Sequence, residues 1–470
     1  MPEQAAAIAQ AQDPELYRLL CEYYRHADVR KRMCEFLGAA DLDRATALYI
    51  TATDGYADYR LRSLPCELYE YLDGALEIDR SLWDKKSLIA DIDLEYHNFD
   101  FPAAPWLDPE RAFRFEQPVL NATLRILGKT GIHPLVLVSG RGFHLLWAVR
   151  RASPAFRRIE ALGHVPVRLE ERYAGPCAPD GTIVEPELGR AFAGLGLIME
   201  YIGHCVWTAA ETAQLPVKPA AIEVGPGPYG REIVSFDLSE YGDPFHTRHI
   251  RIPFSAYLKP RQMEWALGRA EISRLLPIFE IPLGKASPLD AIRLMREPDA
   301  VRALSKEASV EIPDASEPMG ALLDEYEHSE LAEFHQSFYA RTARESSSAL
   351  REPPCLAYIF NHPNDWLLRP AALQHVVRVL MTLGWRPTSI AARIYGSYLN
   401  DHDWRDTWVR LEPCNRALFY TRLFSGMIVA GVDKLVDFNC VSHREKGYCT
   451  VAECSSNLLA YREALLKRRN

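Results

Sequence analysis

Residues 87–96 read SLIADIDLEY, and the fold is best approached from this stretch. Asp91, Asp93 and Glu95 alternate with apolar residues, which is the period of a β-strand with one buried face. The three carboxylates would project from the other face, where they repel one another unless a cation lies between them. Such hard oxygen ligands suit Mg²⁺ or Mn²⁺, and a pair of these ions is typical of phosphoryl and nucleotidyl transfer. Solvated strand faces carry similar motifs, so this one alone does not decide the function.

A second polar motif lies in residues 134–149, PLVLVSGRGFHLLWAV. The pattern predicts a strand, a tight turn containing glycine and a second strand. The glycines let the backbone approach a ligand, while Ser139, Arg141 and His144 offer hydroxyl, guanidinium and imidazole groups suited to a triphosphate. The alternative interpretation is an ordinary hairpin with a glycine-rich turn and a surface arginine.

The third motif lies in residues 231–260, REIVSFDLSEYGDPFHTRHIRIPFSAYLKP. Asp237 follows an apolar strand and would add a carboxylate from another strand to the metal site. Arg251 and Lys259 follow on the next strand and at its end, where they would place positive charge beside incoming phosphates. The alternative is that Asp237 caps a turn and that the basic residues are solvated.

Residue patterns divide the chain into four parts. Residues 1–45 have apolar residues at helical spacing and predict an N-terminal helical segment. Residues 46–280 alternate short β-type runs with helical patterns, which predicts a mixed α/β (α+β) domain, and the three polar motifs that would make it the catalytic domain lie in it. Residues 281–345 are helix-prone, polar and interrupted, as in a helical connector and linker. Residues 346–470 predict an all-α C-terminal domain, which contains five of the ten cysteines.

Composition limits the class of protein. Of the 470 residues, 48% are hydrophobic and 25% charged, which suits two or three globular domains and excludes a disordered or coiled-coil chain. The formal charge of −9 excludes a uniformly basic nucleic-acid binder but not an enzyme with a local basic groove. The sequence has no apolar run of membrane-spanning length and no signal-peptide pattern, so we expect a cytoplasmic protein without a membrane partner.

Taken together and in this order, the three motifs resemble the catalytic core of the archaeo-eukaryotic primase superfamily. The resemblance is greatest to the small catalytic subunit of archaeal and eukaryotic primases. DIDLEY resembles the first motif, SGRGFH the second, and FDL followed by IRIPFSAYLK the third with its basic segment. Upstream, DYRLRS resembles a strand of that subunit and would place Arg60 near the nucleotide or the template. The resemblance extends over roughly residues 45 to 270.

The resemblance implies a role for each matching residue. The divalent ions, Mg²⁺ or Mn²⁺, would be bound by the carboxylates of Asp91, Asp93 and Asp237. The phosphates of the incoming nucleotide would be bound by Ser139, Arg141 and His144, with Arg251 and Lys259 assisting. One position departs from the family: Tyr257 stands where the small subunit usually has a histidine. The role of Glu95 stays open.

The C-terminal cysteines suggest a second metal site. Cys355 lies in EPPCLAYIF, whereas Cys440, Cys449 and Cys454 lie in NCVSHREKGYCTVAEC. This distribution resembles the C-terminal domain of the primase large subunit, although the last two spacings are shorter here. In that domain a PPC-like start and three later cysteines bind a [4Fe–4S] cluster. The resemblance therefore implies a [4Fe–4S] cluster on these four cysteines, with zinc as the alternative.

Two further residues compete for this metal site. Cys414 is expected to be a buried structural cysteine, because free cysteine is among the most buried residue types. His443 lies among charged residues and is expected to be solvated or to contact the template. Ten cysteines are too dilute for a disulfide scaffold in a chain of this length. Those outside the C-terminal part have no ligand-like spacing and are expected in the core.

The resulting expectation is a DNA-dependent primase or primase-polymerase. It would synthesise short primers de novo from NTPs or dNTPs on a single-stranded DNA template by two-metal nucleotidyl transfer. Starting without a primer requires two nucleotides to be held together on the template, so the C-terminal domain would serve as an accessory binding element. A replicative helicase or polymerase is a possible partner. The alternatives are a repair- or defence-associated polymerase that only extends primers, and an inactive module that binds single-stranded nucleic acid.

Overall fold

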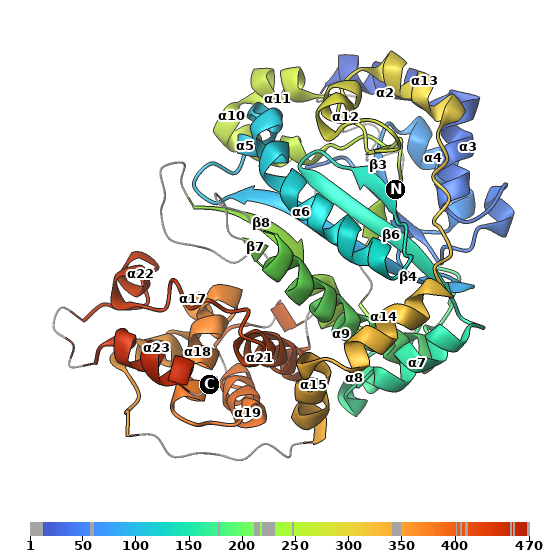
Figure 1. The fold of residues 1–470 in the computed structure, drawn as a ribbon. Coiled ribbons are helices and arrows are strands. Elements are labelled where there is room, and N and C mark those ends of the chain that lie inside the picture. The colour runs from blue at the N-terminus through green and yellow to red at the C-terminus, as the bar shows by residue number, and fades with distance from the viewer. Residues whose placement is uncertain are drawn as a thin grey trace.

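The structure is a computed structural model of the 470-residue chain. Figure 1 shows its mixed α+β architecture, with two β-sheets in the N-terminal part and helices towards the C-terminus. The description covers residues 13–56, 61–176, 179–210, 217–218, 231–246, 249–340, 349–400, 402–404, 407–408, 412–451, 454 and 456–467.

The larger sheet has six strands in the order β10-β5-β6-β4-β8-β7. Neighbouring strands are antiparallel except for β7 and β8, which are parallel. The predicted acidic strand is β4, the longest of the six, and it lies between β6 and β8. The strands are β4 Ser87–Asn98, β5 Leu135–Val138, β6 Gly142–Arg150, β7 Val217–Lys218, β8 Glu232–Asp237 and β10 Ile281–Pro282.

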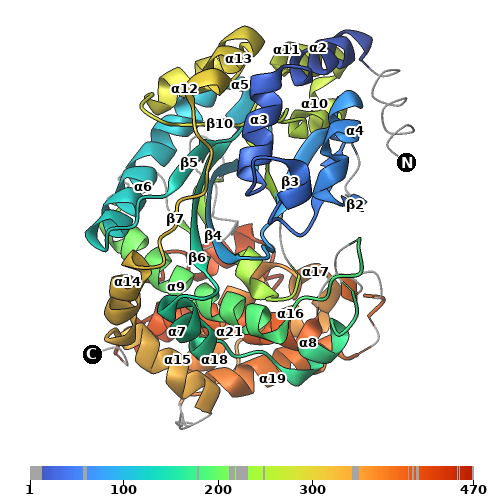
Figure 2. The same cartoon turned by 90° about the vertical axis from the view of Figure 1, so that its right-hand side faces the viewer.

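The smaller sheet has four antiparallel strands in the order β2-β1-β3-β9. Its register sets Thr51 opposite Asp79 and Asp79 opposite Arg251, so these polar side chains share one face. The two sheets are seen side by side in Figure 2. The strands are β1 Ile50–Thr53, β2 Leu61–Ser63, β3 Glu77–Ser81 and β9 His249–Arg251.

Two long helices cover the apolar face of the larger sheet, α6 (Pro109–Lys129) and α9 (Pro186–Ala209), as Figure 1 shows. Tyr96 of β4 stacks on Phe115 of α6. Phe236 of β8 packs against Trp207 of α9. Because alternate residues of β4 turn to opposite faces, this packing leaves the acidic residues of β4 on the face away from the two helices.

The N-terminal helices α2 (Pro14–Tyr24) and α3 (Ala27–Phe36) confirm the predicted helical segment. The hydroxyl of Tyr24 donates to the carbonyl of Leu76 at 3.0 Å and accepts from the amide of Ala256 at 2.8 Å. It therefore ties β3 to the loop that follows β9.

The described residues after 349 contain helices and no strands, as the sequence predicts for an all-α C-terminal part. Its helix α21 (Pro413–Val429) is joined to α9 by an ion pair: Arg422 Nε donates to Glu200 Oε1 at 2.9 Å. His335 of α15 (Glu330–Ala340) lies 3.0 Å from the other oxygen of the same carboxylate. The main cluster of buried apolar side chains is continuous from Leu16 to Leu465, so the C-terminal part packs firmly against the rest.

The remaining helices surround this core, and none in the described part of the chain combines the length and apolar character needed to cross a membrane. The α-helices are α4 Leu68–Asp73, α5 Ala104–Leu107, α7 Pro154–Leu162, α8 Val167–Arg172, α10 Glu264–Leu267, α11 Arg269–Leu275, α12 Pro288–Leu294, α13 Pro298–Glu307, α14 Pro318–Glu327, α15 Glu330–Ala340, α16 Pro354–Asn361, α17 Pro363–Trp366, α18 Pro370–Thr382, α19 Pro387–Tyr398, α22 Cys440–Glu445 and α23 Leu458–Lys467. The 3₁₀ helices are η1 Leu42–Arg44, η2 Pro65–Glu67, η3 Ser239–Gly242 and η4 Lys259–Met263.

Candidate functional site

The register of β4 with its two neighbours brings the predicted acidic residues together. Asp93 stands opposite His144 of β6 on one side and opposite Asp237 of β8 on the other. Glu95 stands opposite Gly142, the last residue of the SGRG turn. Directly paired residues point to the same face of a sheet, so residues from three strands share one polar face.

Asp91 lies at the inner end of this face and is 3% exposed. His144 Nδ1 is 3.1 Å from Asp91 Oδ2. Burial alone would lower the pKa of His144, but the carboxylates of Asp91 and Asp93 outweigh burial and hold that pKa well above its ordinary value. The two carboxylates therefore favour the protonated imidazole, whose positive charge offsets part of theirs.

Asp93 lies in surroundings that disfavour its charged form. Its Oδ1 atom is buried and has no hydrogen-bond partner among the described residues. Burial raises the pKa of Asp93 well above its ordinary value, and the nearby carboxylate of Glu95 adds to the effect. Asp237, by contrast, accepts a hydrogen bond from the amide of Ser239 at 2.7 Å. Asp93 thus offers a buried oxygen that a cation could contact.

The fit of divalent ions to this face follows from the donor set. Within the described ranges, no three His, Cys, Asp or Glu side chains are gathered closely enough to hold one metal ion. The donors are nevertheless of the right kind, because carboxylate oxygens from two neighbouring strands are ligands that Mg²⁺ and Mn²⁺ prefer. The donor types and the strand register suit a divalent ion, but the described side chains do not form a ready-made site for one.

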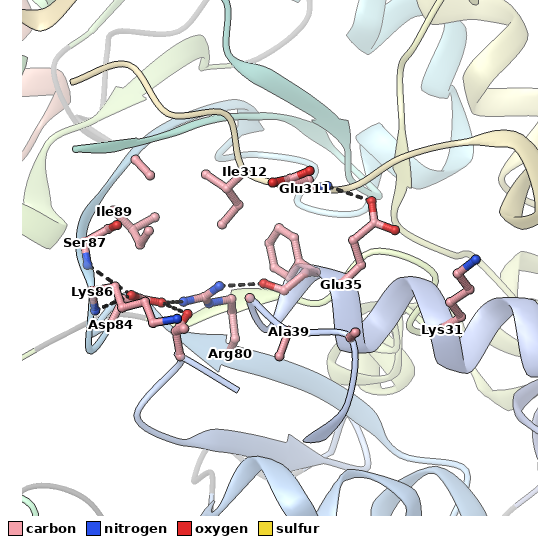
Figure 3. Close-up of a pocket in the computed structure, with 15 residues that line it drawn as sticks. Lys31, Glu35, Ala39, Arg80, Asp84, Lys86, Ser87, Ile89, Glu311 and Ile312 are labelled. Atoms are coloured by element: carbon pink, nitrogen blue, oxygen red, sulfur yellow. Dashed lines mark hydrogen bonds and ion pairs between the residues drawn. The ribbon is translucent and has the colours of Figure 1, made fainter. Parts of the chain in front are cut away.

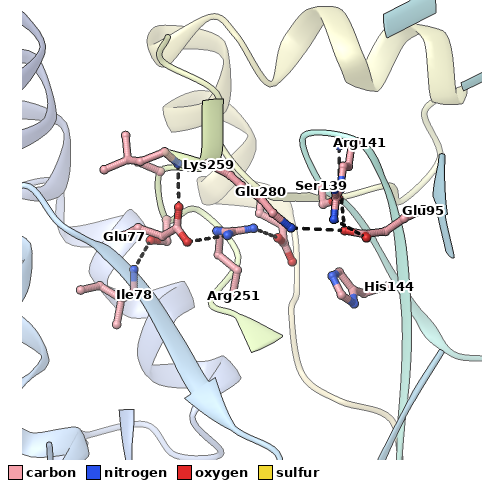
Figure 4. Close-up of polar contacts among 12 residues, drawn as sticks. Glu77, Ile78, Glu95, Ser139, Arg141, His144, Arg251, Lys259 and Glu280 are labelled. Carbon is pink, nitrogen blue, oxygen red and sulfur yellow. Dashed lines mark hydrogen bonds and ion pairs between the residues drawn. The ribbon is translucent and has the colours of Figure 1, made fainter. Parts of the chain in front are cut away.

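Beside the carboxylates, Arg141, Lys259 and Glu95 form a group that we call the cradle (Figure 4). Arg141 Nε donates to Glu95 Oε1 at 2.8 Å, and its Nη2 donates to the second oxygen. Lys259 Nζ lies 3.8 Å from Glu95 Oε1. Burial alone would raise the pKa of Glu95, but Arg141 and Lys259 outweigh it and hold that pKa well below its ordinary value. Glu95, whose role the sequence leaves open, thus orients the two cations.

The turn of the second motif is closely packed on Tyr257. A Cβ atom added to Gly140 would lie 2.5 Å from the Tyr257 ring, so only glycine fits there. The Tyr257 hydroxyl is buried and has no hydrogen-bond partner among the described residues. Ser139 is 2% exposed, and its hydroxyl accepts from the amide of Arg141 at 3.5 Å. The turn is therefore fixed in place and forms part of the surface that lines the candidate site.

Arg251 lies on another side of the candidate site and is bonded to two carboxylates. Its Nη2 donates to Glu77 at 2.5 Å and its Nη1 donates to Glu280 at 3.2 Å. The guanidinium also lies 4.3 Å from the centre of the Tyr257 ring. Arg251 is 8% exposed and bridges Glu77 and Glu280. Its phosphate contact stays a prediction.

Two further residues complete the account of the predicted core. Arg60 lies outside the described residues. Arg62, two positions later on β2, has its guanidinium 4.7 Å from the centre of the Tyr49 ring.

Glu116 of α6 was not predicted. It is fully buried, and neither of its carboxylate oxygens has a partner among the described residues. Burial raises the pKa of Glu116 well above the ordinary value. Its position on the apolar side of α6 is the signal that would have identified it.

The four predicted cysteine ligands line a single cavity of about 290 Å³ in the C-terminal part. The amide of Leu458 donates to Cys440 Sγ and that of Ser456 to Cys454 Sγ, both at 3.4 Å. Burial raises the pKa of Cys355 to about 12, and neighbouring Cys449 adds to the effect. Metal binding would remove that proton, because the thiolate is the ligand. Chain segments far apart in sequence thus bring four thiols around one space.

The competing ligands occupy different positions. Cys414 does not line this cavity, whereas His443 does. His443 is only 2% exposed, its ring centre lies 4.0 Å from that of His375, and its Nδ1 is 2.7 Å from the carbonyl of Asn439. The expectation of a solvated or template-contacting His443 is therefore wrong, because the ring packs inside the helical part. No disulfide links the cysteines within the described residues.

A larger cavity of about 490 Å³ lies at the other end of β4 (Figure 3). Ser87 and Ile89 contribute to its lining from β4. Arg80, at its edge, donates to Asp84 at 3.0 Å and to the carbonyl of Ser81 at 3.0 Å. Asp84 in turn accepts from the hydroxyl of Thr46. Arg80, Asp84 and Thr46 thus bond one another within the lining of this cavity.

No family model, no curated protein and no solved structure matches this chain.

Proposed function

We propose that the protein is a DNA-dependent primase or primase-polymerase that synthesises short primers de novo on single-stranded DNA. The observation that carries the proposal is the register that sets Asp93 between His144 and Asp237, with Asp91 on the same face of β4. Acidic residues on neighbouring strands, next to a cationic cradle, are what template-directed nucleotidyl transfer requires.

Within this proposal, Asp91, Asp93 and Asp237 hold two Mg²⁺ or Mn²⁺ ions. When bound, such ions lower the pKa of an attacking hydroxyl and stabilise charge on a leaving pyrophosphate. The protonated His144 contributes a fixed positive charge beside Asp91, 3.1 Å from its carboxylate. Its proximity limits the negative charge that the strand face presents to an incoming nucleotide.

The cradle binds the triphosphate in this proposal. Arg141 offers a planar fork of donors, and Lys259 adds a second cation 3.8 Å from the same carboxylate of Glu95. The phosphates compete with Glu95 for these donors, so Glu95 keeps the cations oriented before the nucleotide arrives. Ser139 and the backbone of the glycine turn form the rest of the surface around the triphosphate. Arg251 supports it from behind through Glu77 and Glu280.

The C-terminal part serves as the initiation element in this proposal. In this proposal its four cysteines hold a [4Fe–4S] cluster, with zinc as the alternative; the observation in favour is that all four line one cavity. The Glu200–Arg422 ion pair fixes this part against the catalytic domain. Single-stranded DNA and NTPs or dNTPs are the substrates, a replicative helicase or polymerase is the partner, and the cytoplasm is the location.

Unprimed synthesis tests the proposal. The purified protein is given single-stranded DNA, Mg²⁺ or Mn²⁺, a γ-labelled ATP or dATP and either NTPs or dNTPs, beside the D91A/D93A double variant. Labelled oligomers from the wild-type protein alone are the expected result. Extension of an annealed primer without unprimed synthesis would replace the proposal by a repair- or defence-associated polymerase. Silence in both assays would leave a single-stranded nucleic-acid-binding module.

A further inference from the structure

The polar face of β4 continues beyond Glu95 to His97. Asp93, Glu95 and His97 are partly exposed, whereas the residues between them are buried, so the three side chains lie on one face of the strand. His97 Nε2 lies 3.3 Å from Glu95 Oε2, and the two side chains are 18% and 14% exposed. His97 also stands opposite Ile233 of β8, so pairing of the two strands fixes its place.

Glu95 is therefore in contact with three basic side chains. Arg141 Nε donates to its carboxylate at 2.8 Å, and Lys259 Nζ lies 3.8 Å from the same oxygen. His97 approaches the other oxygen. The three bases come from the 139–142 turn, from the start of η4 and from β4 itself, and they hold the pKa of Glu95 well below its ordinary value although burial opposes this. Basic groups from three segments around one carboxylate make an anion-binding site in which Glu95 is the built-in anion.

A chain of phosphates suits this site better than a single carboxylate. Phosphates carry more negative charge and more acceptor oxygens than Glu95, so they would displace its carboxylate from the three bases. Successive residues on the polar face of β4 are about 7 Å apart along the strand. A phosphate chain that starts at Asp93 and passes Arg141 and Lys259 therefore ends nearest His97.

We infer that His97 is a substrate-binding residue for the terminal phosphate of a nucleoside triphosphate, and that it gives the site a preference for triphosphates over diphosphates. The inference rests on the proposed function for the direction of the nucleotide, since that function places the reacting α-phosphate at the carboxylates of Asp91 and Asp93. Arg141 and Lys259 bind the inner phosphates, which a diphosphate also has. Only the terminal phosphate reaches His97.

The test measures binding of dATP and of dADP by isothermal titration calorimetry in Mg²⁺ without DNA, so that no synthesis takes place. The variants are H97A, which removes the imidazole, and H97Q, which keeps a neutral hydrogen-bond donor. H133A is the matched control, because His133 is exposed and precedes β5 at the end away from the 139–142 turn. All variants are checked for an unchanged thermal midpoint.

We expect H97A to weaken the Kd for dATP about ten-fold, as for the loss of one hydrogen bond to a charged group, and to leave the Kd for dADP within about two-fold. H97Q should recover part of the loss for dATP, and H133A should bind both nucleotides like the wild-type protein. An equal weakening of dATP and dADP by H97A would overturn the inference, because it would show that His97 only holds Glu95 in place. Unchanged binding of dATP by H97A would overturn it as well.

The same measurements separate this inference from the proposed function. A preference for dATP that depends on His97, in a protein that never synthesises DNA, would uphold the terminal-phosphate contact and refute the primase. Unprimed synthesis together with a preference that does not depend on His97 would do the reverse. Failure of the wild-type protein to bind either nucleotide would refute both.

Discussion

The hydroxyl of Tyr241 forms two hydrogen bonds with the backbone of Asp91: it accepts from the amide at 3.1 Å and donates to the carbonyl at 2.7 Å. The paired part of β8 ends at Asp237, opposite Asp93. Tyr241 therefore supplies the hydrogen-bond donor and acceptor that a longer β8 would have supplied to the backbone of Asp91. Tyr241 belongs to η3, and the next residue, Gly242, accepts from Asn415 of α21. The C-terminal part therefore touches the segment that fixes Asp91.

The first prediction concerns this contact. Tyr241→Phe leaves a buried amide and carbonyl without partners and should cost about 1–3 kcal/mol of unfolding free energy. Because the backbone of Asp91 loses its anchor, we expect kcat to fall about ten-fold or more while the KM for nucleotide changes little. Tyr398→Phe is the matched control, since it removes a buried bond to the carbonyl of Leu367 far from the carboxylates. An equal loss of kcat in both variants would contradict a positioning role.

The second prediction concerns the cradle. Arg141→Lys keeps the charge but loses the fork that grips Glu95, so the KM for nucleotide should rise roughly 10- to 100-fold. Steady-state kinetics on a primed template measure the change. Arg150→Lys serves as the control, because Arg150 is exposed at the far end of β6 and pairs with Asp314. A KM shift of the same size in the control would exclude a specific role for Arg141.

A third prediction tests the acidic face without reference to activity. Asp93 carries a buried, unpartnered oxygen opposite Asp237, so Asp93→Asn should raise the thermal midpoint in EDTA by removing uncompensated charge. Added Mn²⁺ should stabilise the wild-type protein and leave the variant nearly unchanged. Asp299→Asn is the control, since the Asp299 side chain is 88% exposed. A variant that is less stable than wild type in EDTA would show that Asp93 is compensated by the protein itself.

The fourth prediction concerns the cysteine cavity. Cys355→Ser or Cys440→Ser should remove most of the bound metal, measured as iron and zinc content together with absorbance near roughly 400 nm. Cys414→Ser should keep the metal, because Cys414 does not line the cavity. If initiation depends on this site, the first two variants lose unprimed synthesis and keep primer extension. Metal loss from Cys414→Ser alone would move the site to the competing ligand.

The fifth prediction concerns the contact between the two parts of the chain. Arg422→Met leaves the Glu200 carboxylate with His335 as its remaining partner and should cost about 3–5 kcal/mol of unfolding free energy. Chemical denaturation measures this loss. Arg274→Met should change stability by less than about 0.5 kcal/mol, because Arg274 is 78% exposed in its pair with Glu271.

The same ion pair predicts a dependence on pH. Burial alone would raise the pKa of Glu200, but Arg422 and His335 outweigh it and lower that pKa from 4.5 to about 2. The folded pKa is below the unfolded one, so the stabilisation is complete above about pH 4.5 and is lost as the pH falls towards 2. The stability of Glu200→Gln should be flatter than that of wild type over this interval. If the stability of both proteins changed in the same way with pH, Glu200 would not be the group responsible.

The sequence predicts the acidic strand well because its information is local. Alternation over residues 91–95 is enough to place three carboxylates on one face of β4. The partners of Arg251 could not be predicted in this way, since Glu77 and Glu280 lie 174 and 29 residues away along the chain. Local pattern therefore does not reveal the two carboxylates that hold the Arg251 guanidinium.

The same contrast explains the C-terminal part. The helices follow from local periodicity, whereas the burial of His443 depends on His375 and Tyr448, whose rings pack around it. His443 thus has charged neighbours in the sequence, whereas in the fold its ring packs against other aromatic rings. Glu95 is a similar case, because its partner Arg141 comes from the next motif.

Because β4 is paired on both sides, a change in its length would affect the whole strand. A one-codon deletion between Ser87 and Asp91 would move every later residue of β4 by one position and turn the carboxylates towards α6, while Ile92 and Leu94 would face the cradle. A substitution changes one side chain of β4, but a change in length here would invert the whole strand at once. We expect natural variation in this segment to consist of residue replacements, with length changes confined to the turns beyond it.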